Sequence, residues 1–196
     1  MSKQLEFVYD VVSFPTYLAW TQLPTIAEEA GCRLRMTPVF CGGIFKSTGN
    51  PGPLSIPAKR KWYFDDLIMR AKHLDVPFVM NPHSPIQTLP IMRGVFVAEE
   101  REEMDAYVKT MFEAIWVHAR NLNEVDEVRA TLVEAGLDAD AYFAEIQRDD
   151  IKSRLRKNTD DAVARGAFGV PTFFVGDQMF FGQDRLDFVQ EALRSR

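Results

Sequence analysis

The chain has 196 residues, 46% hydrophobic and 12% aromatic, so it can bury a large core and is neither disordered nor fibrous in composition. Its 23 basic and 28 acidic residues give a formal net charge of -5 and are mixed along the chain, which argues against a nucleic-acid partner. Residues 1–10 carry no apolar signal-peptide core, and no run of about 18 apolar residues follows. We therefore expect a cytoplasmic protein with no membrane partner.

Neither the cysteines nor the histidines have the spacing of a reactive or metal-binding pair. Cys32 and Cys41 lie nine positions apart, which fits neither C-x-x-C nor a zinc site. A reducing compartment would keep both as thiols, and we expect both to be buried and inert. His73, His83 and His118 are too far apart in the sequence to predict a metal site.

The N-terminal part has the pattern of a strand, a helix and a second strand. Residues 5–12, LEFVYDVV, are β-branched and aromatic and predict a buried strand. Pro15 then opens a helical stretch, YLAWTQLPTIAEEAG at 17–31, which Pro24 should kink or shorten. Residues 32–40, CRLRMTPVF, alternate enough to form a second strand, parallel to the first through a right-handed crossover.

The middle of the chain is predicted to be a long connection followed by helices. Residues 41–57, CGGIFKSTGNPGPLSIP, are dense in Gly, Pro and Ser, so we expect a surface connection that could form one wall of a site. Residues 58–74 and 87–166 have helical periodicity. At the end, VPTFFVGDQMFFG at 170–182 predicts a hairpin, and 183–196 predicts a last helix. Strands at both ends thus predict one sheet, with an all-α insertion between them.

Four segments, which with the intervening helices span nearly the whole chain, carry a family resemblance. They are YDVVSFPTYLAW at 9–20, GGIFKSTGNPGPLSIPAKRKWYFDDL at 42–67, NPHSPIQTLPIMRG at 81–94 and ARGAFGVPTFFVGDQMFFGQDRLDFV at 164–189. The chain resembles the DsbA-like branch of the thioredoxin superfamily, in particular kappa-class glutathione transferases and 2-hydroxychromene-2-carboxylate isomerases. The resemblance implies an α/β, thioredoxin-like sheet domain of the DsbA/kappa type at 1–57 and 167–196, with a helical insertion domain at 58–166.

Ser13 and Thr16 stand where redox relatives carry C-x-x-C. The resemblance implies that serine replaces the reactive cysteine and that glutathione, as cofactor, supplies the sulfur. Ser13 lies at the junction of strand and helix, where unpaired N–H groups and the helix dipole favour a negative charge. Its hydroxyl could donate a hydrogen bond to a thiolate. The alternative is that Ser13 only caps the helix.

The same resemblance implies the other glutathione contacts. Pro171 should follow a cis peptide bond, leaving the N–H and C=O of Val170 to pair with the cysteinyl part of glutathione. Asp184 should bind the γ-glutamyl ammonium, and N–H groups near Gln183 its carboxylate, although Gln183 replaces the family's usual Ser. Asn50 should reach the ligand from the long connection. Each also has an ordinary structural alternative: a trans proline, a helix start or a turn.

Three residues are candidates for substrate contacts. Lys46 matches the family's lysine and could orient a substrate carboxylate or hold an enolate, or simply be a solvated surface lysine. His83 and Gln87 should line the substrate pocket. The sequence departs from the family in two ways that affect this pocket: proline is shifted by one to Pro15, and HSPIQT replaces the usual H-F-P-x-N-T.

The resemblance implies a glutathione-dependent isomerase that converts 2-hydroxychromene-2-carboxylate to trans-o-hydroxybenzylidenepyruvate in naphthalene-type aromatic catabolism. Its partners would be glutathione, a small aromatic substrate and a second subunit in a homodimer, and Ser13 and Lys46 would be its catalytic residues. Two alternatives stay open: a kappa-like transferase or peroxidase, and a DsbA-like binding module without redox activity. Disulfide exchange is disfavoured because Ser13 and Thr16 cannot form a disulfide.

Overall fold

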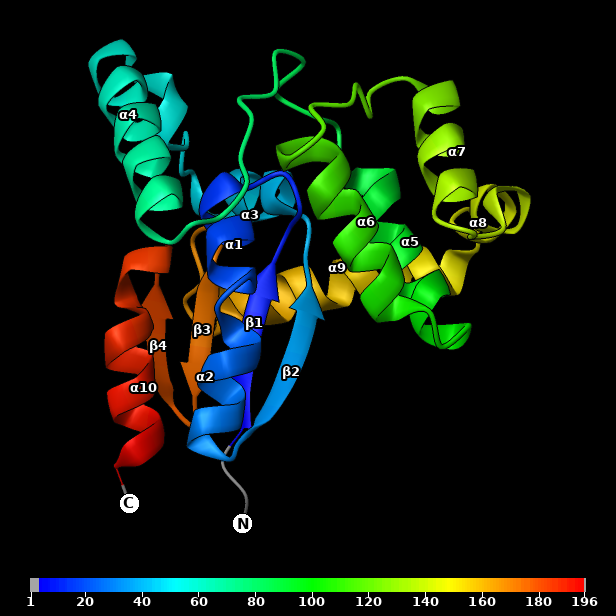
Figure 1. Ribbon diagram of the computed structural model, residues 1–196. Helices are drawn as coiled ribbons and strands as arrows, with labels where there is room; N and C mark the ends of the chain where they lie inside the picture. Colours follow the sequence, from blue (N-terminus) through cyan, green and yellow to red (C-terminus); the bar gives the residue numbers. More distant parts are fainter. Residues whose placement is uncertain (1–3, 196) are drawn as a thin grey trace.

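The computed structural model describes residues 4–195, with a four-stranded mixed sheet of order β2-β1-β3-β4 (Figure 1). β1 (Gln4–Tyr9) pairs in parallel with β2 (Arg33–Pro38) and antiparallel with β3 (Thr172–Val175). β3 forms a hairpin with β4 (Gln178–Phe181). The sheet is therefore assembled from both ends of the chain, as predicted.

The predicted strand, helix and strand are confirmed, but the helix is divided in two. α1 (Phe14–Trp20) is followed by α2 (Leu23–Ala30), with a break at Thr21 and Gln22. Pro24 lies in the first turn of α2, where its missing N–H costs nothing, whereas an uninterrupted helix would need that N–H. The break is the shortening that the proline predicted.

The other helices occupy the middle and the end of the chain. They are α3 (Cys41–Thr48), η1 (Pro53–Ser55), α4 (Pro57–His73), α5 (Leu89–Glu100), α6 (Met104–Trp116), α7 (Val125–Glu134), α8 (Ala139–Glu145), α9 (Asp149–Ala164), η2 (Gln183–Arg185) and α10 (Leu186–Arg194). The predicted helical character of 58–74 and 87–166 is confirmed. The division into domains at 57/58 and 166/167 stays a prediction.

The prediction of an irregular connection at 41–57 is wrong for its first half, because α3 begins at Cys41. Gly42 and Gly43 suggested a loop, but Gly43 allows a close helix contact instead: a Cβ there would lie 3.1 Å from the Thr159 methyl group on α9. α3 also buries Ile44. Tertiary packing thus outweighs the low helix propensity of the two glycines.

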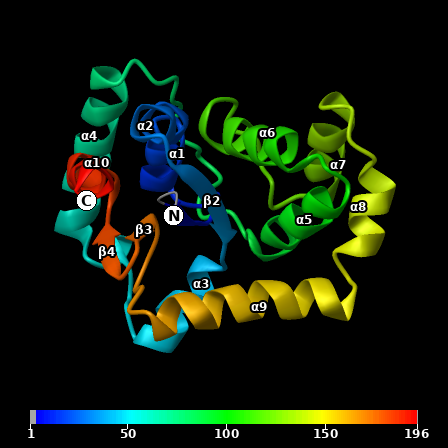
Figure 2. The ribbon, with the colours of Figure 1, turned by 90° about the horizontal axis from the view of Figure 1, so that it is seen from below.

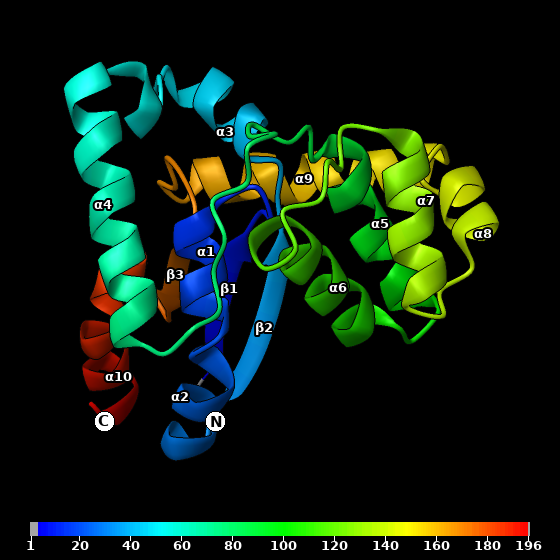
Figure 3. The ribbon, with the colours of Figure 1, turned by 45° about the horizontal axis from the view of Figure 1, so that its top comes forward.

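The helices form layers on both faces of the sheet (Figures 1 and 2). α1, α2 and α10 cover one face, and α3 and α9 lie on the other. Helices α5 to α8 gather beyond the β2 edge, whereas α4 stands on the opposite side of α1 (Figure 3). Within residues 4–195 no helix is both long and apolar enough to cross a bilayer.

The main hydrophobic core runs without interruption from the sheet into the helices. Phe7 and Phe173 on the sheet share one cluster of buried side chains with Phe112 and Ile115 on α6. A smaller cluster on the opposite face includes Val170, which places that segment firmly against the sheet. The ends of the helices are tied separately by ion pairs.

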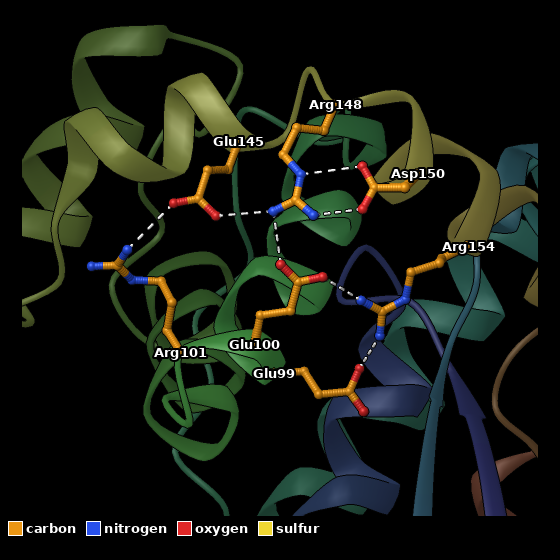
Figure 4. A network of polar contacts seen from close by, with 7 residues as sticks. All are labelled: Glu99, Glu100, Arg101, Glu145, Arg148, Asp150 and Arg154. Atoms are coloured by element: carbon orange, nitrogen blue, oxygen red, sulfur yellow. Dashed lines mark hydrogen bonds and ion pairs between the residues drawn. The ribbon is translucent and has the colours of Figure 1, made fainter.

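These ion pairs form a network between α5, α8 and α9 (Figure 4). Arg148 donates to Glu100 at 2.8 Å and, through two nitrogens, to Asp150 at 3.1 and 2.5 Å. Arg154 on α9 contacts Glu99 and also donates to Glu100, at 2.9 Å. The hydrogen bonds from Arg148 lower the pKa of the Asp150 carboxyl. Exposed ion pairs of this kind connect the ends of the helices but contribute little to the stability of the fold.

Candidate active site

Four connecting segments meet at one edge of the sheet. β1 and β2 are parallel, so the chain leaves both strands at the same edge. Thr172, at the start of the antiparallel β3, pairs with Val8 near the end of β1 and with Phe181 at the end of β4. The segments that meet are residues 10–13, 39–50, 168–171 and 182–184.

Ser13 both caps α1 and contacts the segment before β3. Its Oγ accepts the Thr16 N–H at 3.3 Å and donates to the Val170 carbonyl at 3.3 Å. Hydroxyl hydrogen bonds are typically about 2.7 to 2.8 Å long, so the bond to Val170 is weak and the proton can turn to a stronger acceptor. The Thr16 hydroxyl, by contrast, is fully buried and has no partner within residues 4–195.

The peptide bond before Pro171 is cis, as the resemblance implied. We expected the N–H and the C=O of Val170 both to be unpaired. This is wrong for the C=O, which accepts a hydrogen bond from the Ser13 hydroxyl. The Val170 N–H has no hydrogen-bond partner in the described part of the chain. Pro171 accepts the Gly182 N–H at 3.0 Å, which joins the segments 168–171 and 182–184.

Asn50 ties the end of the α3 segment to the same place. Its Nδ2 donates to the Phe168 carbonyl at 2.8 Å, two residues before Val170. Its Oδ1 accepts the Gly52 N–H at 2.9 Å, so it also forms the turn that the sequence left open as an alternative. Lys46 lies in the last turn of α3, four residues before Asn50, with its side chain exposed.

Gln183 and Asp184 form η2, which packs against α1 and leads directly into α10. Gln183 is buried, whereas Asp184 is exposed and pairs with Arg185 at 2.6 Å. Exposed ion pairs contribute about 0 to 1 kcal/mol, so the Asp184 carboxylate can exchange Arg185 for another cation at little cost.

His83 and Gln87 lie together on the loop before α5. Asn123 joins them, since its Nδ2 donates to the His83 carbonyl at 3.1 Å and its Oδ1 accepts the Gln87 N–H at 2.9 Å. Gln87 lines an apolar cavity of about 140 Å³ among α5 to α8, with Ile91 and Tyr142. Within residues 4–195 no hydrogen bond or ion pair joins His83 or Gln87 to Ser13. Their role as substrate contacts stays a prediction.

The shifted proline changes what surrounds the start of α1. With proline at Pro15, Phe14 becomes the first helical residue, and its buried ring stacks on Phe78 at 3.8 Å between centroids and on Trp116 at 5.3 Å. Trp116 also donates to the Val11 carbonyl at 2.9 Å. Helix α6 and the loop before α5 thus hold the turn that carries Ser13.

Asp10 is a residue of this site that the sequence analysis did not single out. It is fully buried at the end of β1, where its Oδ1 accepts the Val12 N–H at 3.0 Å and its Oδ2 the Cys41 N–H at 2.8 Å. Burial raises the pKa of the Asp10 carboxyl to about 6, although hydrogen bonds from Cys41 and Val12 lower it. A carboxylate directly after an apolar strand was the signal that could have identified it.

Neither cysteine offers a reactive sulfur. Both are free thiols, with Cys41 buried and Cys32 half-buried, so the expectation of burial holds fully for Cys41 and in part for Cys32. Burial raises the pKa of both thiols. Both side chains therefore stay protonated, and any thiolate at Ser13 must come from another molecule.

A model of the DsbA-like thioredoxin domain matches residues 4–194. The chain belongs to this family. The DsbA-like chain is 30% identical to 2-hydroxychromene-2-carboxylate isomerase of Sphingobium xenophagum, over 98% of its own length and 99% of the relative's. It is 26% identical to glutathione S-transferase kappa 2 of Caenorhabditis elegans, covering 97% and 92% of the two chains.

A solved structure of 2-hydroxychromene-2-carboxylate isomerase superposes on this DsbA-like chain with a TM-score of 0.85, at 25% identity, covering 97% of this chain and 94% of the other. The predicted family and thioredoxin-like fold are therefore confirmed. The relatives are isomerases and glutathione transferases, which supports an enzymatic, glutathione-related function for the chain.

Proposed function

We propose that the chain is a glutathione-dependent isomerase that converts 2-hydroxychromene-2-carboxylate to trans-o-hydroxybenzylidenepyruvate. The observation that carries the proposal is a serine hydroxyl, in hydrogen-bond contact with Val170 beside the cis-Pro171 bond, at the place where redox relatives have a thiol. Burial raises the pKa of both of the chain's own thiols, and neither cysteine occupies the position of Ser13. Sulfur chemistry at Ser13 therefore needs an imported thiol, and the similarity to kappa transferases favours glutathione.

The proposed glutathione position uses the segments that meet at the sheet edge. The unpaired Val170 N–H would donate to the cysteinyl part of the tripeptide as an added strand does. Asp184 would bind the γ-glutamyl ammonium, and the N–H groups around Gln183 its carboxylate. Asn50, already bonded to Phe168, would close the site from the α3 side.

Ser13 would stabilise the glutathione thiolate without becoming the nucleophile. A free thiol has a pKa of about 8.5, so most of it is protonated at neutral pH. The Ser13 hydroxyl can leave its long bond to Val170 and donate to the sulfur anion, which is a stronger acceptor. The start of α1 adds a favourable field there.

In the proposed reaction the hemiketal ring opens and the thiolate adds to the conjugated side chain. A carbon–sulfur bond forms, the carbon–carbon double bond becomes single, and the electron pair moves onto the carbonyl as an enolate, which Lys46 would stabilise. After rotation about the single bond, the enolate collapses, the double bond forms again and the thiolate leaves. Glutathione is regenerated, so it acts as a cofactor. His83 and Gln87 would contact the aromatic substrate.

The similarity to kappa-class transferases supports a second candidate, a transferase or peroxidase that consumes glutathione. A binding module without redox activity is the third. One assay separates them: the ultraviolet spectrum of the chromene carboxylate is followed with and without glutathione while total free thiol is measured. The proposal predicts glutathione-dependent conversion with no loss of thiol. Thiol loss would favour the transferase, and no conversion and no binding at millimolar glutathione would favour the module.

We further propose that the enzyme works as a cytoplasmic homodimer in aromatic catabolism. α4 exposes 66% of Trp62 and 61% of Met69 seven residues apart, on one face of the helix. A second subunit would cover such an apolar face. Sedimentation equilibrium should give twice the mass of the chain, and a Trp62→Lys variant should shift the equilibrium toward monomer. A monomeric wild type would contradict the proposal.

A further inference from the structure

Four hydrogen bonds and the chain segments between them form a closed circuit at the proposed site, and this circuit passes through Asp10. Asp10 accepts the Ser13 N–H through its main-chain oxygen at 3.2 Å and the Cys41 N–H through its carboxylate at 2.8 Å. From Cys41 the circuit continues along α3 to Asn50, then to Phe168, and returns from Val170 to Ser13. Asp10 is the only member of this circuit whose side chain is both fully buried and ionisable.

The Asp10 carboxylate uses both of its oxygens as hydrogen-bond acceptors. Its two oxygens face the N–H groups of Val12 and Cys41, which can only donate. Protonation would turn one oxygen into a donor, for which the Thr88 hydroxyl is a possible acceptor, and would weaken the bond of that oxygen to its N–H group. The Cys41 N–H belongs to the first turn of α3, where a carboxylate satisfies an unpaired donor and complements the helix dipole.

We propose that Asp10 is a positioning residue: its ionised carboxylate clamps the Ser13 turn to the start of α3 and so fixes the Ser13 hydroxyl opposite Val170. This inference rests on the proposed glutathione site and adds a residue to it. It predicts that protonation of Asp10 loosens the turn and weakens thiolate binding, although Asp10 touches neither the thiol nor the substrate.

The groups around Asp10 do not titrate in the same pH range, so the titration of Asp10 can be observed separately. They are the Tyr9 phenol on β1, the Cys41 thiol on α3 and the Thr88 hydroxyl just before α5. Burial raises the pKa of both Tyr9 and Cys41, so all three stay neutral while Asp10 titrates. A transition near pH 6 in this region would therefore belong to Asp10.

The first experiment needs no ligand. Amide resonances of Val12 and Cys41 in the ¹⁵N-labelled wild type should shift with a common inflection near pH 6, and the inflection should be lost in Asp10→Asn. Glu6→Gln is a matched control, because Glu6 is a buried carboxylate on the same strand that pairs with Arg165 and Thr37. It should keep the inflection. Two wild-type amides that do not titrate between about pH 4 and pH 8 would overturn the inference.

The second experiment measures glutathione binding by calorimetry and the pKa of the bound thiol by thiolate absorbance. Asp10→Asn should bind about tenfold more weakly and raise the thiol pKa, Asp10→Glu should recover part of both, and Glu6→Gln should match the wild type. Unchanged affinity and thiol pKa in Asp10→Asn would overturn the inference. If the wild type binds no glutathione, the proposed function fails, and the amide titration still decides whether Asp10 is the clamp. If Asp10→Asn does not fold, the wild-type pH titration decides it.

Discussion

Among single residues, Asp10 should make the stability of the fold depend on pH. Ionisation of its buried carboxyl should lower the free energy of unfolding, although the ionised form is the one that positions Ser13. Burial raises the pKa of Asp10 from 3.8 to about 6. Between these two pH values the folded state keeps a proton on Asp10 that the unfolded chain has already released. Its contribution to stability is therefore complete below about pH 4 and is lost as the pH rises through about 6.

The free energy of unfolding of the wild type should thus fall relative to that of Asp10→Asn, by about 2 kcal/mol between about pH 4 and pH 7. Urea denaturation of both proteins over this range measures the difference and removes the effect of the other carboxylates. A difference that stays constant, or grows with pH, would show that Asp10 does not titrate as a buried carboxyl.

Some residues of the site could be predicted from the sequence and others could not. Pro171 and Asn50 follow from the resemblance because their motifs are local. For Asp10 the sequence shows only a carboxylate directly after an apolar strand, because its burial depends on three segments that meet only in the fold. The engagement of the Val170 carbonyl by Ser13 likewise depends on a contact across 157 positions.

At the scale of elements, α6 supports the turn that carries Ser13 through one side chain. Trp116→Phe would leave the buried Val11 carbonyl without its donor, which typically costs about 1 to 3 kcal/mol. It should also weaken glutathione binding, because the turn is held less firmly. Urea denaturation and calorimetry check the two effects.

Val133→Ala on α7 is the control for Trp116→Phe, since Val133 is 61% exposed and lies outside both the proposed site and the proposed interface. Its effect on the free energy of unfolding should stay within about 0.5 kcal/mol. Equal effects of the two substitutions would mean that the contact between Trp116 and Val11 does not support the turn.

The elements differ in how well periodicity predicted them. The hairpin and the long helices were correct because their patterns are strong and local. The prediction of a loop at α3 is wrong because Gly43 serves close packing against Thr159 on α9, which no local pattern shows. The periodic region 87–166 did not show where its helices end: it divides into α5 to α9, with the break between α8 and α9 just before Asp149.

At the scale of the whole molecule, the continuous core predicts that sheet and helical region unfold together. Buried side chains of β1 and β3 share one cluster with those of α5 to α9, and ion pairs tie the helix ends (Figure 4). Far-ultraviolet circular dichroism and tryptophan fluorescence should therefore give coincident urea transitions. Two separated transitions would show that the proposed helical insertion domain unfolds independently.

If Ser13 holds the thiolate of an imported glutathione, the pKa of the bound thiol depends on the Ser13 hydroxyl. In the wild type this pKa should lie below the free value of about 8.5. In Ser13→Ala it should rise by about one to two units, because a hydrogen bond to a charged group is lost. Ser47→Ala, on the exposed side of α3, should behave as the wild type. An equal thiol pKa in the wild type and in Ser13→Ala would show that Ser13 does not stabilise the thiolate.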